Sequence, residues 1–367
     1  MLTKMDREFG NTINRLIRKE NLSRRESKDA FMAVIDQHTT EMQQGAFLSA
    51  LTAKGETADE IAGCFEAIYE RDTAKATPAS RGALVENCGT GMDTLKTFNI
   101  STAASILAAA GGIKMARHGA RAITSVCGTV DMAEALGVDV ECSARIVSQS
   151  IDTANIGLFN GMSPEIHPSA LGRILSQICF GSTLNIAASL ANPALPSLAV
   201  RGVYKREMML PALNVMKAIG YTRALVVFGG VDQSEKGMDE ASVCGETFAA
   251  ELTTSGDVNE FTFHPEDLGL ARHAPDALFP QDTVDNEARR FVSLIQGKEN
   301  GARKDAALLN AGLIYYVAGQ ADTIAAGVQK AQEAMETDGP FRTLENWVTA
   351  QNRHPEQGLE KLHRWVG

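Results

Sequence analysis

The stretch from Ala83 to Gly112, ALVENCGTGMDTLKTFNISTAASILAAAGG, carries the strongest structural signal in this sequence. The run ALVENC is typical of a strand, GTGMD of a glycine turn, and NIST stands at the mouth of an alanine-rich helix. Exposed backbone N–H groups and the positive end of a helix dipole meet in such an arrangement. It favours an anion, with phosphate the natural ligand, although a GTG turn alone can be a simple tight turn.

Strand-like and helix-like stretches alternate downstream of this segment. We predict strands at residues 112–119, 200–204 and 224–230, and helices at residues 211–220, about 285–319 and 321–335. This alternation predicts an α/β domain over residues 83–367, with a central, mostly parallel sheet flanked by helices. Residues 351–367 are compatible with one more helix, to which we assign no function.

Upstream, residues 1–75 predict a small all-helical domain, which helices from about 165–190 could join. Ser23 is typical of an N-cap and Gly55 of a C-cap, and Thr57 to Glu60 has the form of a capping box. The small, polar, proline-containing segment 72–82 predicts a hinge between the two domains.

Composition bounds the classes of function. With 367 residues, the chain is long enough for about two domains. Its net charge of −10 argues against broad binding of nucleic acid or of an anionic membrane. The six cysteines are scattered without metal-ligand spacing, which predicts reduced thiols. We find neither an apolar signal segment nor a membrane-spanning run, and therefore expect a cytoplasmic protein with no membrane partner.

A second cluster reverses the overall charge. Residues 114–121, KMARHGAR, precede Thr124, Ser125, Gly128 and Thr129, and residues 87–130 carry a local net charge of +3. Cations beside hydroxyls favour phosphate or pyrophosphate through charge-assisted hydrogen bonds. A solvated basic face is the alternative interpretation.

A third cluster follows the apolar run 224–228. Asp239 and Glu240 are adjacent carboxylates on a predicted loop at the end of a strand. Oxygen ligands of this kind can hold Mg²⁺, which usually accompanies phosphate. Acidic pairs are also common on ordinary surfaces.

The three clusters together resemble a known family. GTGMD…NIST, RHGARAITSVCGTVD and GMDEASVCGET are similar to the signatures GTGGD, NIST, KHGNRxxSSxSGSxD and GGLDE of the anthranilate phosphoribosyltransferases. Residues 45–63, 190–204 and 304–319 resemble the helical region, the Asn-Pro segment and the C-terminal helices of that family. The resemblance runs in one continuous order over residues 15 to 350.

This resemblance implies a 5-phosphoribosyl-1-pyrophosphate (PRPP) donor, release of pyrophosphate, an Mg²⁺ cofactor and a homodimer built through the helical domains. It implies closure of the domains about residues 72–82. The positions that would bind PRPP are Gly89, Met92, Asp93, Thr97, Asn99, Ile100, Ser101, Thr102, Arg117, His118, Gly119, Ser125 and Thr129. Those that match the family's metal ligands are Ser101, Asp239 and Glu240.

The acceptor side departs from the family pattern. KHGN reads Arg117 to Ala120 here, and the family's carboxylate-binding arginine falls at Gly181 or Ser182. Gly-Pro is replaced by Ala188-Ser189, and Arg173 is either a substitute carboxylate partner or an ordinary surface arginine. The candidate acceptor residues are Gly89, His118, Ala120, His167, Arg173, Gly181 and Ser182. We therefore expect an aromatic or heterocyclic nitrogen acceptor, with anthranilate not favoured.

Two alternatives remain open at this point. One is a non-catalytic relative of the same fold that binds a ligand or nucleic acid, against which the Asp239–Glu240 pair and the complete NIST motif argue. The other is a pyrimidine nucleoside phosphorylase, which shares the architecture and is disfavoured by GTGMD and by the shorter chain.

Overall fold

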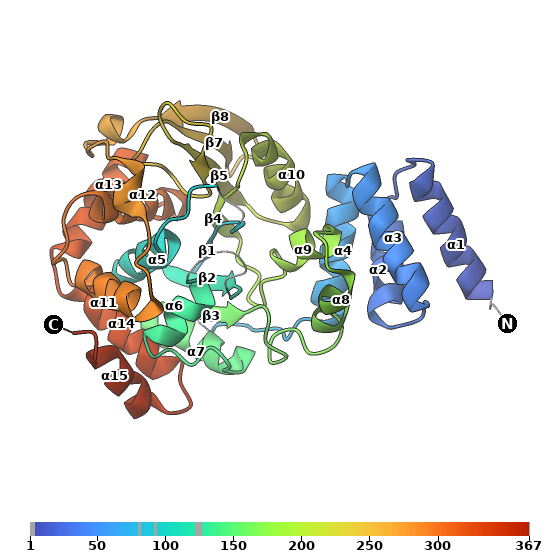
Figure 1. The fold of residues 1–367 in the computed structure, drawn as a ribbon, viewed down its shortest axis with the longest axis horizontal. Coiled ribbons are helices and arrows are strands. Elements are labelled where there is room, and N and C mark those ends of the chain that lie inside the picture. Colours follow the sequence, from blue (N-terminus) through green and yellow to red (C-terminus); the bar gives the residue numbers. More distant parts are fainter. Residues whose placement is uncertain (1–3, 80–81, 92–93, 122–126, 367) are drawn as a thin grey trace.

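The computed structural model describes the chain except for residues 1–3, 80–81, 92–93, 122–126 and 367. A helical part lies at one end of the molecule, beside a larger α/β part (Figure 1). The helical part contains α1 (Lys4–Ile17), α2 (Arg24–Ile35), α3 (Glu41–Lys54) and α4 (Ala58–Arg71). Two later helices, α8 (Leu171–Ile178) and α9 (Thr183–Ala188), share its apolar core.

Local sequence signals explain where these helices begin and end. Ser23 and Thr57 each accept a hydrogen bond from the third residue of the following helix, Glu26 and Glu60, which completes two capping boxes. Gly55 ends α3 with a φ of 88°, a conformation that glycine adopts without a steric penalty. The predicted caps are confirmed.

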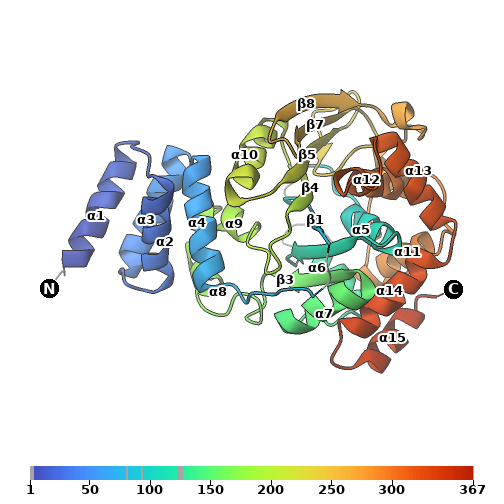
Figure 2. The same ribbon diagram turned by 180° about the vertical axis from the view of Figure 1, so that it is seen from behind.

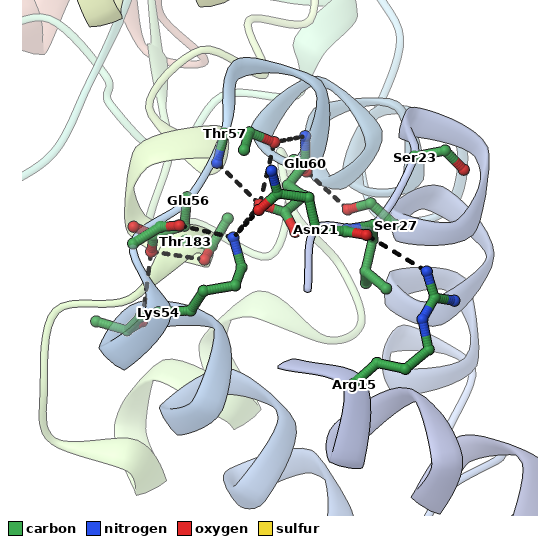
Figure 3. A network of polar contacts seen from close by, with 12 residues as sticks. Arg15, Asn21, Ser23, Ser27, Lys54, Glu56, Thr57, Glu60 and Thr183 are labelled. Atoms are coloured by element: carbon green, nitrogen blue, oxygen red, sulfur yellow. Dashed lines mark hydrogen bonds and ion pairs between the residues drawn. The ribbon is translucent and has the colours of Figure 1, made fainter. Parts of the chain in front are cut away.

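A buried polar network joins the helical part to α9 (Figure 3). The fully buried Glu60 carboxylate accepts hydrogen bonds from Leu22 N at 2.8 Å and from Lys54 Nζ at 2.9 Å. Beside it, Thr183 Oγ1 donates to Glu56 Oε1 at 2.8 Å. The start of α9 is therefore fixed to the turn between α3 and α4.

The α/β part is built on one sheet with the strand order β3 (Ile156–Asn160), β2 (Lys114–Gly119), β1 (Leu84–Cys88), β4 (Leu198–Gly202), β5 (Arg223–Gly230), β7 (Thr247–Leu252) and β8 (Val258–Phe263). The first five strands are parallel, whereas β7, β8 and the short β6 (Gly237–Met238) pair antiparallel. The expected mostly parallel sheet flanked by helices is confirmed.

Helices cover both faces of this sheet (Figure 2). The larger core lies between the sheet and α5 (Ile100–Ala110), α6 (Thr129–Ala135), α11 (Val284–Ile295), α12 (Ala302–Val317), α13 (Ile324–Met335) and α14 (Gly339–Ala350). The opposite face packs against α10 (Met209–Ile219) and the helical part. Because strand side chains alternate, Val200 faces the first core and its neighbour Ala199 the second.

The remaining helices lie at the periphery. Helix α7 (Ala144–Ala154) precedes β3, and α15 (Pro355–His363) forms in the segment where we expected one more helix. Three short 3₁₀ turns occupy residues Arg206–Met208, Pro265–Leu268 and Pro275–Leu278.

The sequence did not predict strands β3, β6, β7 and β8. Strand β3 is a short run directly after Asn155, which ends α7 in a left-handed conformation, so it has no separate turn signal. Strand β8 is an edge strand with mostly exposed residues, so it lacks the apolar alternation of a buried strand. All six cysteines are free thiols, as expected. Among the described residues, no helix combines the length and apolar character needed to cross a membrane.

Candidate active site

Three strand ends make room for the loop that carries the acidic pair. This loop follows β6 and begins at Asp239. A Cβ atom at Gly89 would collide with the Asp239 carboxylate, and one at Gly202 with its backbone carbonyl. One at Gly229 would collide with the Glu240 carbonyl. Glycines at the ends of β1, β4 and β5 therefore allow the acidic loop to lie directly on the sheet edge.

The acidic pair contacts both the glycine turn and the helix N-terminus of the stretch from Ala83 to Gly112. Asp239 Oδ2 accepts hydrogen bonds from Gly91 N at 2.6 Å and from Thr90 Oγ1 at 3.2 Å. Ser101 Oγ in the first turn of α5 donates to Glu240 Oε1 at 3.3 Å. The structure therefore brings the glycine turn, the helix N-terminus and the carboxylates to one place.

An asparagine that the sequence analysis did not single out holds the acidic loop. Asn310 in α12 donates from Nδ2 to Ala241 O and accepts from Ala241 N, each at 3.0 Å. It is 3% exposed within the apolar stretch from Ala306 to Val317, a pattern that could have marked it as a positioning residue.

Two helix N-termini face the same edge. Helix α5 begins at Ile100, and its N-cap residue Asn99 donates from Nδ2 to Cys127 O at 3.1 Å. Helix α6 begins at Thr129, two residues after Cys127. Gly119, at the end of β2, packs against the Thr129 side chain. These contacts place Asn99, Gly119 and Thr129 at one edge, and Thr97 is half-buried in the loop before α5.

The predicted phosphate ligand Arg117 lies beneath this edge. It is 1% exposed, and its guanidinium donates to Thr102 Oγ1 at 2.8 Å and to Asn87 O at 3.4 Å. Burial lowers its pKa to about 10, and the nearby Cys88, Glu86 and Glu240 act in the opposite direction. In this structure Arg117 and Thr102 bind each other, and direct contact of either with phosphate stays a prediction.

Fewer positive charges are available at this edge than the count over residues 87–130 suggests. Lys114 lies at the opposite edge of the sheet, where Nζ donates to Asp152 O at 2.8 Å. Arg121 forms ion pairs with Glu134 at 2.7 Å and Asp131 at 3.2 Å, two acids just beyond the counted window. The net charge of +3 therefore overstated the cations available to phosphate.

Two histidines lie on the acceptor side. The rings of His118 on β2 and His167 lie 5.5 Å apart, edge to face. Burial, followed by the charges of His167 and Arg201, lowers the pKa of His118 to about 3, so its ring is neutral at physiological pH. His118 Nε2 is buried without a hydrogen-bond partner among the described residues, and Gly161 leaves the space beside it.

Asp72, which follows α4, positions His167. Its carbonyl contacts His167 Nδ1 at 2.6 Å, so this ring nitrogen carries the proton. Its carboxylate accepts from Ser169 N at 2.6 Å and from Leu171 N at 2.7 Å, at the start of α8. The sequence marked this residue only as the start of a hinge.

The other predicted acceptor residues do not form one cluster. Arg173 in α8 donates to Gln44 Oε1 at 3.3 Å, toward the helical part. Gly181 is exposed, Ser182 caps α9, and Ala120 is exposed after β2. The described structure therefore offers no cation at 181 or 182. Met92, Asp93 and Ser125 lie outside the described residues.

The side-chain oxygens at this site suit a magnesium ion. Ser101, Asp239 and Glu240 supply hydroxyl and carboxylate oxygens, the ligands that Mg²⁺ prefers. Among the described residues, no group of three His, Cys, Asp or Glu side chains could hold a metal by itself. The carboxylate pair of Asp239 and Glu240 suits a site at which phosphate and water complete the coordination of Mg²⁺.

Comparisons with known proteins agree with this geometry. A model described as the α/β domain of a glycosyl transferase family matches residues 81–339, and the helical bundle domain of that family matches residues 11–71. The anthranilate phosphoribosyltransferase of Rubrobacter xylanophilus is 36% identical over 92% of this chain and 96% of its own length. The chain belongs to the anthranilate phosphoribosyltransferase family. This confirms the predicted class of enzyme, a PRPP-dependent phosphoribosyltransferase among the glycosyltransferases.

Further relatives extend the likeness. The anthranilate phosphoribosyltransferase of Halorubrum lacusprofundi is 37% identical over 89% of this chain and 87% of its own length. The crystal structure of the Thermus thermophilus enzyme has a TM-score of 0.82 at 29% identity, covering 92% of this chain and 98% of that one. The Saccharomyces cerevisiae enzyme, solved in complex with PRPP and Mg, has a TM-score of 0.80 at 22% identity and shows the shared fold.

Proposed function

We propose that this enzyme transfers the 5-phosphoribosyl group from PRPP to an aromatic or heterocyclic nitrogen acceptor, with release of pyrophosphate. The observation that carries the proposal is the convergence of Gly91, Ser101, Asp239 and Glu240 at one edge of the sheet. A relative from the same family supports the donor, because the Saccharomyces cerevisiae protein was solved with PRPP and Mg.

The donor half of the site follows from charge. The acceptor nitrogen forms a bond to the anomeric carbon while the C–O bond breaks, the bonding electrons leave with pyrophosphate, and the proton of the acceptor nitrogen passes to water or to the released pyrophosphate. Backbone N–H groups of the glycine turn and of the α5 N-terminus would bind the phosphates. Ser101, Asp239 and Glu240 would hold Mg²⁺, which neutralises the departing pyrophosphate when bound. Asn310 fixes the acidic loop in place.

The acceptor half depends on orientation. His118 Nε2 is neutral and without a protein partner in the described structure, so it can accept a hydrogen bond from the attacking nitrogen. A pKa of about 3 makes this imidazole too weak a base to retain a proton near neutrality. His118 therefore orients the acceptor, and such alignment can contribute several kcal/mol, up to about 7–11 kcal/mol in the best cases.

We also propose that the enzyme is a homodimer that assembles through its helical parts. Ile17 at the end of α1 is 65% exposed and Met42 on α3 is 80% exposed. Both helices lie at the end of the molecule remote from the sheet (Figure 1). Sedimentation of wild type against the double variant Ile17→Glu, Met42→Glu would show a dimer that dissociates, and a wild-type monomer would refute the proposal.

Release of pyrophosphate tests the proposed activity. Wild type should release pyrophosphate from PRPP only when Mg²⁺ and an aromatic or heterocyclic nitrogen acceptor are both present. The double variant Asp239→Asn, Glu240→Gln should lose this activity, whereas Glu235→Gln, an exposed residue before β6, should retain it. Equal activity in the double variant would refute the metal assignment.

A further inference from the structure

Arg201 on β4 is a buried arginine that the sequence motifs did not mark. It is 5% exposed and pairs in register with Cys88 on β1. Its guanidinium donates to Cys88 Sγ at 3.3 Å and to Ser189 Oγ, just after α9, at 2.6 Å. Two residues earlier, Ala199 belongs to the core shared with the helical part. Because alternate strand residues share a face, Arg201 points toward the helical part.

His118 occupies the same face, on β2. A hydrogen bond to the Ser189 backbone acts on His118, and the charge of Arg201 contributes to the low pKa of its ring. Ser189 therefore contacts both side chains, one through its backbone and one through its hydroxyl. The unpartnered Nε2 of His118 lies beside Gly161, while Arg201 is held beside Ser189.

No carboxylate of the described residues is paired directly with Arg201, and the charges of Glu86 and Asp239 act on it from farther away. Among the described residues, no carboxylate lies within 4.0 Å of this guanidinium, and its hydrogen-bond acceptors are a thiol and a hydroxyl. Glu86, on the same face of β1, is occupied by Asn192 Nδ2 at 2.9 Å and Tyr221 OH at 2.7 Å. Buried charges are normally paired, so this cation is suited to an anionic group brought by a ligand.

The departures from the family pattern near Arg201 are consistent with binding of an anionic ligand group. Gly181 and Ser182 carry no charge, and Arg173 is directed to Gln44 in the helical part. Ser189 stands where the family signature has proline, which has no hydroxyl to hold Arg201 in place. A fixed guanidinium can bind a carboxylate through two hydrogen bonds.

We propose that Arg201, in place of positions 181 and 182 of the family pattern, binds the carboxylate of the acceptor and directs it at β4. The inference rests on the phosphoribosyltransferase activity proposed above. It makes Arg201 a specificity-determining residue, with Ser189 as its positioning partner.

Matched pairs of acceptors test this assignment. The probes are 2-, 3- and 4-aminobenzoate, each compared with its neutral amide, at saturating PRPP and Mg²⁺. Wild type should have a lower KM for at least one carboxylate than for its amide. Arg201→Gln should raise that KM about ten- to hundredfold, the usual effect of losing a charged hydrogen bond, and leave the amide and PRPP values unchanged. Arg201→Lys should restore part of the loss, and Ser189→Ala should produce a smaller one.

Each other result contradicts the assignment. Equal losses for the carboxylate and its amide would show that Arg201 has only a structural role, and thermal unfolding would show whether Arg201→Gln is folded. A selective loss in Arg173→Gln with none in Arg201→Gln would transfer the role to Arg173. A wild type that binds PRPP but prefers every amide would refute an anionic acceptor. Absence of PRPP binding would instead refute the proposed function. The control for loss of a strand arginine is Arg223→Gln on β5, which removes the arginine paired with Glu251.

Discussion

Ser101 Oγ lies 3.3 Å from Glu240 Oε1, although the two residues are 139 positions apart. This contact joins the N-terminus of α5 to the loop after β6. It places a helix dipole and a carboxylate pair on either side of one site, an arrangement that suits a phosphate ligand together with a cation. A relative from Saccharomyces cerevisiae was solved with a ligand and a cation of these kinds, PRPP and Mg.

Replacing Asn310 should loosen the acidic loop. Asn310→Leu leaves the buried N–H and C=O groups of Ala241 without their partners, at a cost of about 1–3 kcal/mol for each group. We expect a lower free energy of unfolding by denaturant and a weaker dependence of turnover on Mg²⁺. Asn214→Leu, on the exposed face of α10, should change stability by no more than about 0.5 kcal/mol. Unchanged stability in Asn310→Leu would show that the two hydrogen bonds do not hold the loop.

The glycine at the end of β4 should not tolerate a side chain. A Cβ atom at Gly202 would collide with the Asp239 carbonyl, so Gly202→Ala must displace the acidic loop. We expect a loss of Mg²⁺-dependent pyrophosphate release that exceeds any loss of stability. Gly45→Ala, in α3 with open space around it, should be neutral or stabilise the protein by about 0.5–1 kcal/mol. Full activity in Gly202→Ala would contradict the close approach of the loop to the sheet.

The low pKa of His118 predicts how stability depends on pH. Burial, with the charges of His167 and Arg201, lowers this pKa from 6.5 to about 3. Between pH 6.5 and pH 3 the unfolded state binds a proton that the folded state does not, so stability falls as the pH falls. At pH 5 the cost from His118 is about 2 kcal/mol relative to pH 7.5.

Denaturant unfolding of wild type and His118→Leu at the two pH values measures this term. The variant should lose about 2 kcal/mol less than wild type on acidification. His167, whose pKa is also lowered by burial, contributes in the same direction in both proteins and cancels in the comparison. An identical loss in both proteins would show that His118 is not held in its neutral form.

Local signals predicted the elements that surround the candidate donor site. The glycine turn before NIST, the helix that begins at Ile100 and the Asp239–Glu240 pair are each encoded within a few neighbouring residues. The register of the sheet then brings them together, because β1, β4 and β5 end at the same edge. The resemblance to the family assigned PRPP and Mg²⁺ to these residues, and that assignment stays a prediction.

The acceptor half depends on contacts that no short stretch encodes. Arg201 meets Cys88 across 113 residues, and its role follows only from strand register and from the face of β4 that it occupies. Arg121 appeared available in the sequence, but Asp131 and Glu134 neutralise it from the next helix. Strand β8 was missed for a related reason, since an edge strand with mostly exposed residues carries little apolar periodicity.

Calorimetric titration of the protein with PRPP, with and without Mg²⁺, tests the central assignment most directly. Wild type should bind PRPP with Mg²⁺ present, and the double variant Asp239→Asn, Glu240→Gln should bind it at least about tenfold more weakly, because removing charged ligands of this kind costs about 1.5–3 kcal/mol. Binding by Glu235→Gln should equal that of wild type. Failure of wild type to bind PRPP in the presence of Mg²⁺ would contradict the proposed function.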